Sequence, residues 1–289
     1  MSRRLAVVGG AVDDPIDAPI LLPALADAGW DASARSWHDS SVDWSAFDVV
    51  LLRSCWDYVD DPAGFLDWLD AVGTTTTVLN HPALVRWNVD KSYLVDLAAD
   101  GVPIVPSAVV TTAADVALPS VRFVVKPAVG GGSRLVQLFA PDEVSAATAH
   151  LARLTDGDGR AVVQPFLPPL DGNVGETNVY VIGGDVTHAV TKSQVLADGA
   201  AAAEDFRLAV EQEVRPAPVR SEHRRLALDV VAAVERRHLR PLYARVDLID
   251  TGDGPLVLEV ELIEPVLFLD RNPQALPSFV SALSSSDSP

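Results

Sequence analysis

Residues 243–265 read YARVDLIDTGDGPLVLEVELIEP, and this stretch indicates the class of the fold. Two apolar runs, 242–249 and 256–262, flank the turn TGDG at residues 251–254. Runs of this length around a glycine-containing turn are typical of a β-hairpin. Because both runs are rich in Val, Leu and Ile, we expect the hairpin to belong to a buried sheet.

Charged side chains should line one face of this hairpin. Side chains alternate between the two faces of a strand, so Arg245 and Asp247 share a face of the first strand, and Glu259 and Glu261 share a face of the second. Three converging carboxylates repel one another once solvent is excluded, and they therefore need cations. Oxygen ligands favour Mg²⁺ or Mn²⁺. The alternative is a solvated acidic face on an edge hairpin.

The composition excludes several classes of protein. The 289 residues suffice for about two domains, and no apolar run approaches the roughly 20 residues of a membrane span. The net charge of −18 argues against nucleic-acid and membrane partners. The single cysteine, Cys55, favours a reducing compartment, and the start of the chain lacks the apolar region of a signal peptide. We therefore expect a cytoplasmic protein.

Lysine is rare in this chain. Only Lys91, Lys126 and Lys192 stand among the 22 basic residues, and the others are arginine. A compositional bias toward arginine accounts for most of this. Because lysine offers a compact point charge where arginine offers a fork, the three positions are candidates for ligand binding.

The order of elements predicts three units and a tail. Residues 1–88 alternate strands with helices, which is typical of a parallel α/β domain. Residues 89–166 predict a small β-β-α-β lobe, and residues 167–283 predict a mainly antiparallel lobe with one long helix from Ser221. The tail, 284–289, is expected to be disordered. The predicted strands are 4–8, 48–52, 78–79, 121–127, 135–139, 161–166, 179–182, 186–190, 242–249 and 256–262.

A glycine-rich turn follows a strand that ends in lysine. In VVKPAVGGGSR, residues 124–134, Lys126 closes an apolar strand and could reach a phosphate. The glycines of the turn would let backbone N–H groups close over a ligand. The spacing matches neither the Walker A motif nor the dinucleotide fingerprint. The alternative is a flexible hairpin turn.

Two further segments are candidates for ligand contacts. A proline-rich stretch after the strand 161–166 could read a flat heterocycle through its backbone, unless it is an ordinary loop. LLRSCWDYVDD, residues 51–61, follows a strand end where α/β sheets bind ligands. There Arg53 could hold a carboxylate with two hydrogen bonds, or it could be a structural arginine. Cys55 is expected to be buried rather than nucleophilic, and His188 to be a sheet-face side chain or a substrate contact.

Taken in order, these segments resemble the ATP-grasp superfamily over about residues 88–270, and the preceding unit matches its N-terminal domain. The runs LLRSCWDY, NVDKSYL, GETNVYVIGGDVTHAVTKS, DFR, YARVD and LEVELIEP are similar to the glutathione-synthetase-like branch, and within it to the O-ureido-D-serine cyclo-ligase type of D-cycloserine biosynthesis. The resemblance implies an α/β fold in which an N-terminal parallel α/β domain is followed by two α+β lobes that clasp ATP.

The resemblance also implies roles for individual residues. Those that bind ATP would be Lys91 and Lys126, the phosphate cover Gly131, Gly132 and Ser133, the adenine hinge Gln164, Pro165, Phe166 and Leu167, and the ribose ligand Glu176. Those that bind Mg²⁺, or Mn²⁺ in its place, would be Asp247, Glu259 and Glu261. The catalytic residues would be Arg245, Lys192 and Arg207, and the substrate contacts Arg53, Trp56, Asp57 and Glu264.

Three positions depart from the superfamily pattern. Glu261 stands where asparagine is usual as the last metal ligand. Glu264 precedes Pro265 where a Pro-Gly pair is common, and this extra charge could tighten metal binding or face an ammonium group. Gln164 replaces an acidic hinge residue but keeps a hydrogen-bond acceptor.

The expected activity is ATP-dependent ligation. A carboxylate of a small amino-acid-like substrate attacks the γ-phosphorus, and an amine then displaces phosphate from the acylphosphate, so that ADP and phosphate are released. Positioning and charge neutralisation supply the catalysis, and no protein nucleophile is needed. The alternatives are a noncatalytic ATP-binding regulatory protein and a phosphotransferase with a stable phosphorylated product. Cyclisation, intermolecular ligation and a homo-oligomer all remain open.

Overall fold

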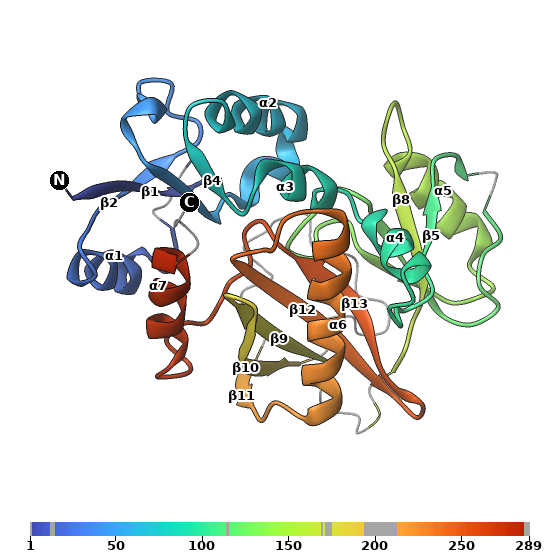
Figure 1. The fold of residues 1–289 in the computed structure, drawn as a ribbon. Helices are drawn as coiled ribbons and strands as arrows, with labels where there is room; N and C mark the ends of the chain where they lie inside the picture. The colour runs from blue at the N-terminus through green and yellow to red at the C-terminus, as the bar shows by residue number, and fades with distance from the viewer. Residues whose placement is uncertain are drawn as a thin grey trace.

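The computed structural model describes residues 2–11, 15–113, 116–168, 170, 175–193 and 213–285. These residues form three β-sheets together with the helices that cover them (Figure 1). The expected α/β class is confirmed, because a parallel sheet at the N-terminus is followed by two antiparallel sheets. Within the described part of the chain, no helix is long and apolar enough to cross a membrane.

The N-terminal sheet is parallel and has the strand order β2-β1-β3-β4. Its strands are β1 (Arg3–Gly9), β2 (Trp30–Ser36), β3 (Val49–Ser54) and β4 (Thr77–Leu79); its helices are α1 (Ala18–Asp27), the 3₁₀ helices η1 (Trp44–Ala46) and η2 (Trp56–Asp60), α2 (Pro62–Gly73) and α3 (Pro82–Asn88). Because helices cover both faces, β3 is buried along its whole length. The sequence analysis missed β2, because this edge strand reads WDASARS and lacks an apolar run.

The small lobe is an antiparallel sheet with the order β5-β8-β6-β7. Its elements are α4 (Tyr93–Ala99), β5 (Ala108–Val110), β6 (Phe123–Pro127), β7 (Gln137–Phe139), α5 (Val144–Leu154) and β8 (Ala161–Pro165). Phe123 and Phe139 pack against Leu151 of α5, which forms the core of the lobe. The strand predicted at 135–139 begins later, because Leu135 has a positive φ of 59° that a strand cannot contain.

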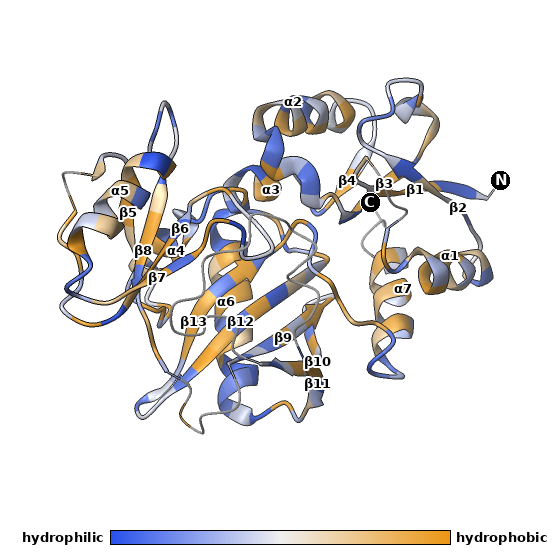
Figure 2. Cartoon of the chain, turned by 180° about the vertical axis from the view of Figure 1, so that it is seen from behind, coloured by the Kyte–Doolittle hydropathy of each residue, from blue (hydrophilic) through white to orange (hydrophobic). Residues whose placement is uncertain are grey.

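The third sheet has the order β11-β10-β9-β12-β13 and lies between the other two (Figure 1). Its elements are β9 (Glu176–Ile182), β10 (Asp185–Lys192), β11 (Val214–Ala217), α6 (Ser221–Arg237), β12 (Tyr243–Thr251) and β13 (Gly254–Glu261). One face packs Val179, Val181 and Val246 against α6. The strands β12 and β13 are mainly hydrophobic (Figure 2), so the charged side chains of this sheet interrupt apolar sequences.

Side chains join the N-terminal sheet to the third sheet. Asn80, which follows β4, donates from Nδ2 to the carbonyls of Tyr243 (2.9 Å) and Leu262 (2.7 Å) and accepts from Leu242 N (2.6 Å). The Tyr243 hydroxyl lies 2.6 Å from the carbonyl of Leu52. The start of β12 and the end of β13 are therefore held against the carboxyl edge of the parallel sheet.

The chain returns to its N-terminal part at the end. Helix α7 (Ala275–Ser285) packs beside α1 (Figure 1). The tail predicted to be disordered thus begins inside this helix, at Ser284 and Ser285, while 286–289 lie outside the described residues. Phe279 and Leu283 of α7 are fully buried, and such burial explains why a serine-rich end remains helical.

Candidate active site

The pairing of β12 with β13 brings the four charged hairpin residues together. Arg245 lies opposite Glu261, and Asp247 lies opposite Glu259. A bulge follows Asp247, so the alternation is broken only beyond the charged pairs. The common face predicted for these residues is present.

Each of the four side chains takes part in an ion pair. Arg245 donates from Nε and Nη2 to the two carboxylate oxygens of Asp247, each at 2.8 Å, and Nη2 also contacts Glu261. On the other side, Lys91 Nζ lies 3.1 Å and Lys126 Nζ 3.6 Å from the Glu259 carboxylate. The arginine thus bridges two acids, and two lysines from outside the hairpin meet the third.

The surroundings set these carboxyl groups apart. Burial by itself would raise the pKa of Glu259, but Lys91 and Lys126 lower it to about 2. Burial raises the pKa of Glu261 to about 7 against the opposing effect of Arg245, and the nearby charges of Asp247 and Glu259 add to the rise. At neutral pH, Glu259 is therefore ionised, whereas Glu261 is partly protonated.

All three lysines of the chain lie at this one site. Lys192, at the end of β10, places Nζ 3.3 Å from Glu176, the first residue of β9. The side chains of Lys91, Lys126 and Lys192 retain 9%, 8% and 13% of their exposure, which is unusual for lysine. Three ammonium groups held at one place in this way are chemically suited to an anionic ligand.

The glycine-rich turn between β6 and β7 closes one side of the site. Its Gly130 carbonyl accepts a hydrogen bond of 2.6 Å from Lys91 Nζ. Gly132 and Ser133 both have φ near 60°, a conformation that glycine adopts without strain and that costs energy at serine. The ion pair of Arg134 with Asp60 ties the turn to η2.

The hinge segment after β8 is held from both sides. Gln164 is buried and donates from Nε2 to Ser107 Oγ at 2.8 Å. Phe166 N donates to the Arg122 carbonyl at 2.8 Å, and the Arg122 guanidinium lies 4.9 Å from the Phe166 ring centre. Pro165 ends β8 and Leu167 follows the hinge without regular structure.

Comparison with known proteins shows which family has this sequence and fold. The profile of the N-terminal domain of D-cycloserine synthetase DcsG matches residues 5–80. The cycloserine biosynthesis protein DcsG of Streptomyces lavendulae is 37% identical over 96% of this chain and 97% of its own length. The chain belongs to the DcsG family.

Solved structures agree with this assignment. The crystal structure of D-cycloserine synthetase DcsG superimposes with a TM-score of 0.86 and 33% identity, over 99% of this chain and 100% of that one. The D-alanine–D-alanine ligase of Bacillus anthracis complexed with ATP has a TM-score of 0.69 and 14% identity, over 99% and 97% of the two chains, so it shares the fold. The expected ATP-grasp fold is confirmed, and this DcsG-family protein is an ATP-grasp ligase that uses ATP.

Two residues expected to contact substrate, Arg53 and Asp57, form hydrogen bonds and ion pairs with other groups of this DcsG-family protein. Arg53 is fully buried, pairs with Asp17 at 2.7 Å and donates to the Pro265 carbonyl at 3.1 Å, which favours the structural alternative for this arginine. The Asp57 carboxylate accepts from Ala11 N at 2.7 Å and Trp37 Nε1 at 2.8 Å, and His38 lies 2.9 Å away. Asp57 therefore organises the loops at the carboxyl ends of β1, β2 and β3.

The structure also shows the surroundings of three other residues that the sequence analysis named, Trp56, Cys55 and His188. Trp56 donates from Nε1 to the Glu264 carbonyl at 2.9 Å. Burial raises the pKa of the Cys55 thiol well above its usual value, in keeping with a structural cysteine. His188 stacks on Tyr180 with ring centres 4.3 Å apart, and its Nε2 lies 2.8 Å from the Leu267 carbonyl. Arg207 lies outside the described residues.

Three residues of the DcsG-family site were missed by the sequence analysis. Asn178 donates to Asp247 at 2.6 Å, and its buried Oδ1 has no hydrogen-bond partner among the described residues. It could have been found, because it stands two residues after Glu176 on the same strand face. Asn88 and Tyr93 bond the outer edge of β13, where the Val260 N–H donates to the Tyr93 hydroxyl at 2.8 Å and Asn88 donates to the Val260 carbonyl at 2.9 Å.

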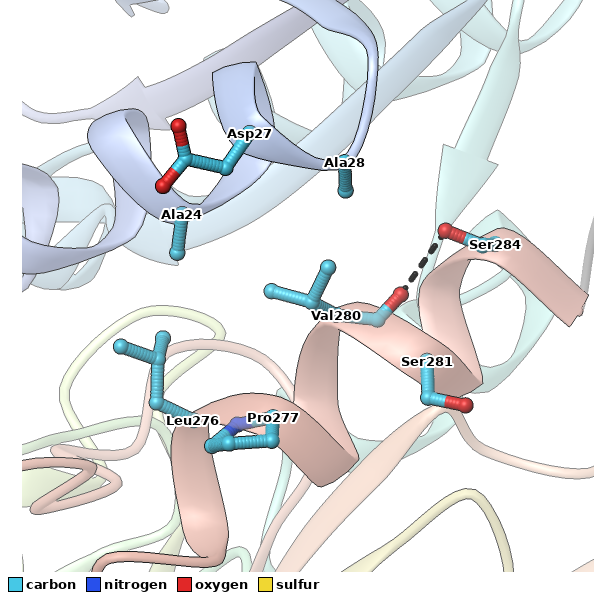
Figure 3. Close-up of a pocket in the computed structure, with 8 residues that line it drawn as sticks. All are labelled: Ala24, Asp27, Ala28, Leu276, Pro277, Val280, Ser281 and Ser284. Carbon is cyan, nitrogen blue, oxygen red and sulfur yellow. Dashed lines mark hydrogen bonds between the residues drawn. The ribbon is translucent and has the colours of Figure 1, made fainter.

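A cavity of about 390 Å³ lies elsewhere, between α1 and α7 (Figure 3). It is lined mainly by apolar and small side chains, among them Leu276, Val280 and Ala24, and its one charged lining residue is Asp27. An acid repels phosphate, so this cavity is less suited to an anionic ligand than the lysine-lined site.

Proposed function

We propose that this protein is a ring-closing ATP-dependent ligase of cycloserine biosynthesis, which activates the carboxylate of a small amino-acid-like substrate as an acylphosphate. The observation that carries the proposal is the convergence of Arg245 with the buried Lys91 and Lys126 on the acidic face of the hairpin, with the partly buried Lys192 paired to Glu176 on β9. The relationship to DcsG supports the ring-closing outcome. A small-molecule reaction in the cytoplasm also accords with the acidic chain and its buried thiol.

The acidic face suits a divalent cation. Asp247, Glu259 and Glu261 offer only oxygen ligands, and the unpartnered Oδ1 of Asn178 is a further buried acceptor beside them. Across the described residues, no three His, Cys, Asp or Glu side chains are already arranged around a metal position. Arg245 accounts for this, because its guanidinium lies between Asp247 and Glu261. We infer that these three acids hold Mg²⁺, with Mn²⁺ as a substitute, when Arg245 turns away from Asp247 and Glu261.

The residues of the site then have distinct tasks. Lys91 and Lys126 exchange Glu259 for the phosphates, which the glycine turn covers with its backbone N–H groups. The hinge from Gln164 to Leu167 holds adenine and Glu176 holds the ribose. Bound Mg²⁺ would neutralise phosphate charge and orient the γ-phosphoryl group.

Two bond exchanges complete the reaction. A substrate carboxylate oxygen attacks the γ-phosphorus, the bond to the β-phosphate oxygen breaks, and ADP leaves. A substrate nitrogen then attacks the acyl carbon, its proton is released, and phosphate leaves. Arg245 and Lys192 stabilise the charge that builds on the transferred group, and Arg207 is proposed to assist them.

The test supplies Mg²⁺, ATP and O-ureido-D-serine to the purified protein. We expect ADP, phosphate and a cyclic product by mass spectrometry, and ¹⁸O placed in the substrate carboxylate should appear in the released phosphate. ATP binding without turnover for any amino acid would favour the regulatory alternative. ADP together with a stable phosphorylated substrate would favour the phosphotransferase.

Mg²⁺ binding to the nucleotide-free protein should tighten as the pH rises through about 7. Burial holds the pKa of Glu261 at about 7, so below that pH the metal must displace a proton. Calorimetry should show an affinity that falls by about tenfold for each pH unit below 7. Glu261→Gln should flatten this profile, and a flat wild-type profile would contradict the assignment.

A further inference from the structure

Glu264 is a buried acid without a counter-charge. The residue is 7% exposed, and among the described residues its carboxylate has neither a hydrogen-bond donor nor an ion-pair partner. Only its backbone carbonyl is bonded, to Trp56 Nε1. A buried carboxylate is costly unless it is paired, and burial accordingly raises the pKa of Glu264 to about 8, so that without a ligand the group is mostly protonated at neutral pH. The missing partner therefore calls for an explanation.

Among the described residues, no cation is available to pair with Glu264. Glu261 is the strongest of its charged neighbours and repels it. The charges of Lys91 and Arg245 act on Glu264, but both are already engaged. Lys91 bonds Glu259 and Gly130, and Arg245 bonds Asp247 and Glu261. A cationic group on a ligand would therefore stabilise the charged form of Glu264.

Glu264 lies within electrostatic range of residues on both η2 and the hairpin. Burial raises the pKa of Cys55 and of Tyr58, and in both cases the charge of Glu264 is the next largest cause. Tyr58 belongs to η2, and the charge of Glu261 on the hairpin reaches it as well. The acid thus lies where the N-terminal sheet meets the site for ATP.

The backbone around Glu264 is anchored on both sides. Trp56 holds the Glu264 carbonyl at 2.9 Å, and Arg53 holds the next carbonyl, that of Pro265, at 3.1 Å. Arg53 is itself fixed by Asp17 in a fully buried pair. A side chain whose backbone is restrained in this way is ready to bind before the ligand arrives.

We propose that Glu264 binds the ammonium group of the substrate and so selects amino acids over simple carboxylic acids. The inference rests on the proposed function, whose substrate places a carboxylate beside Arg245. An α-amino acid carries its ammonium one carbon away from that carboxylate, and Glu264 stands three residues beyond Glu261. Arg53 and Trp56 are then positioning residues that hold Glu264 in place.

The experiment compares two substrates in wild type and Glu264→Gln. One is O-ureido-D-serine, and the other is its desamino analogue, which lacks only the ammonium group. In the wild type we expect kcat/KM to favour the amino substrate by about 10- to 100-fold, the worth of a hydrogen bond between charged groups. In Glu264→Gln this preference should disappear through a higher KM for the amino substrate, while the KM for ATP stays within about twofold.

Control variants separate charge from packing. Glu143→Gln alters an exposed acid in the small lobe and should keep the preference. Glu264→Asp keeps the charge and should retain most of the preference, which also covers the case in which the glutamine variant does not fold. An unchanged preference in folded Glu264→Gln, or its loss in folded Glu264→Asp, would overturn the inference.

The same assay keeps the two proposals apart. Absence of turnover by the wild type with Mg²⁺, ATP and either substrate would overturn the proposed function. Turnover of both substrates at equal efficiency by the wild type would leave the ligase activity standing and would overturn the role of Glu264.

Discussion

Arg245→Met should lower kcat by about 10³- to 10⁵-fold, the range for losing an arginine that stabilises a transferred phosphoryl group. In the structure, the guanidinium is held by Asp247 and Glu261. Its fork can neutralise negative charge that grows on the γ-phosphoryl oxygens as the transition state is reached. The KM for ATP should change only a few-fold, because the interaction strengthens in the transition state. Steady-state measurement of ADP release tests both constants.

Arg245→Lys provides the matched comparison. Lysine keeps the charge but not the two-pronged geometry, so its kcat should fall between those of the wild type and the methionine variant. Circular dichroism should establish that both variants fold, because removing the guanidinium leaves Asp247 and Glu261 without their partner. A raised KM for ATP with an unchanged kcat would show that Arg245 binds the ground state only.

Glu259→Gln should reduce ATP turnover by at least about 10²- to 10³-fold, the loss seen when one electrostatic contact to a transition state is removed. The substitution removes charge with little change in volume. It also frees Lys91 and Lys126, which lie 3.1 and 3.6 Å from the Glu259 carboxylate. Binding of metal-free ATP should consequently tighten, while the gain in affinity on adding Mg²⁺ should shrink.

Calorimetric titration of ATP with and without Mg²⁺ measures this exchange. Glu143→Gln should behave as the wild type in both titrations, since Glu143 is exposed and lies on the small lobe. If Glu259→Gln retained the full effect of Mg²⁺ on ATP binding and turnover, the metal would lie elsewhere.

Alternation along the strands was enough to predict the acidic face of the hairpin. The register confirms that Arg245 lies opposite Glu261 and Asp247 opposite Glu259. Such alternation is a local property of the backbone, so it can be read without knowledge of the rest of the fold. The same logic extends to Asn178, which shares the face of Glu176 but carries no charge to draw notice.

Edge strand β2 and helix α7 show where local reasoning fails. WDASARS has no apolar run, yet it forms β2 because the exposed edge of β1 is there to pair with. Helix α7 ends in serines, but Phe279 and Leu283 are fully buried beside α1 and the parallel sheet. In both cases tertiary contacts override weak local preference.

Local sequence patterns were therefore enough to predict the charged face of the hairpin and the parallel N-terminal sheet, and to single out the three lysines as candidate ligand contacts. The tertiary structure decides which of these groups meet. Asn88 bonds Val260, which is 172 residues away in the sequence. Lys91, in the segment between α3 and α4, pairs with Glu259 on β13. Tertiary contacts also bury Arg53, which pairs with Asp17 and bonds the Pro265 carbonyl next to Glu264. These contacts favour a structural role for this arginine. The periodicity of a strand indicates which face of the sheet a side chain lies on. Which distant residues contact each other depends instead on how whole sheets pack, and no local pattern encodes that packing.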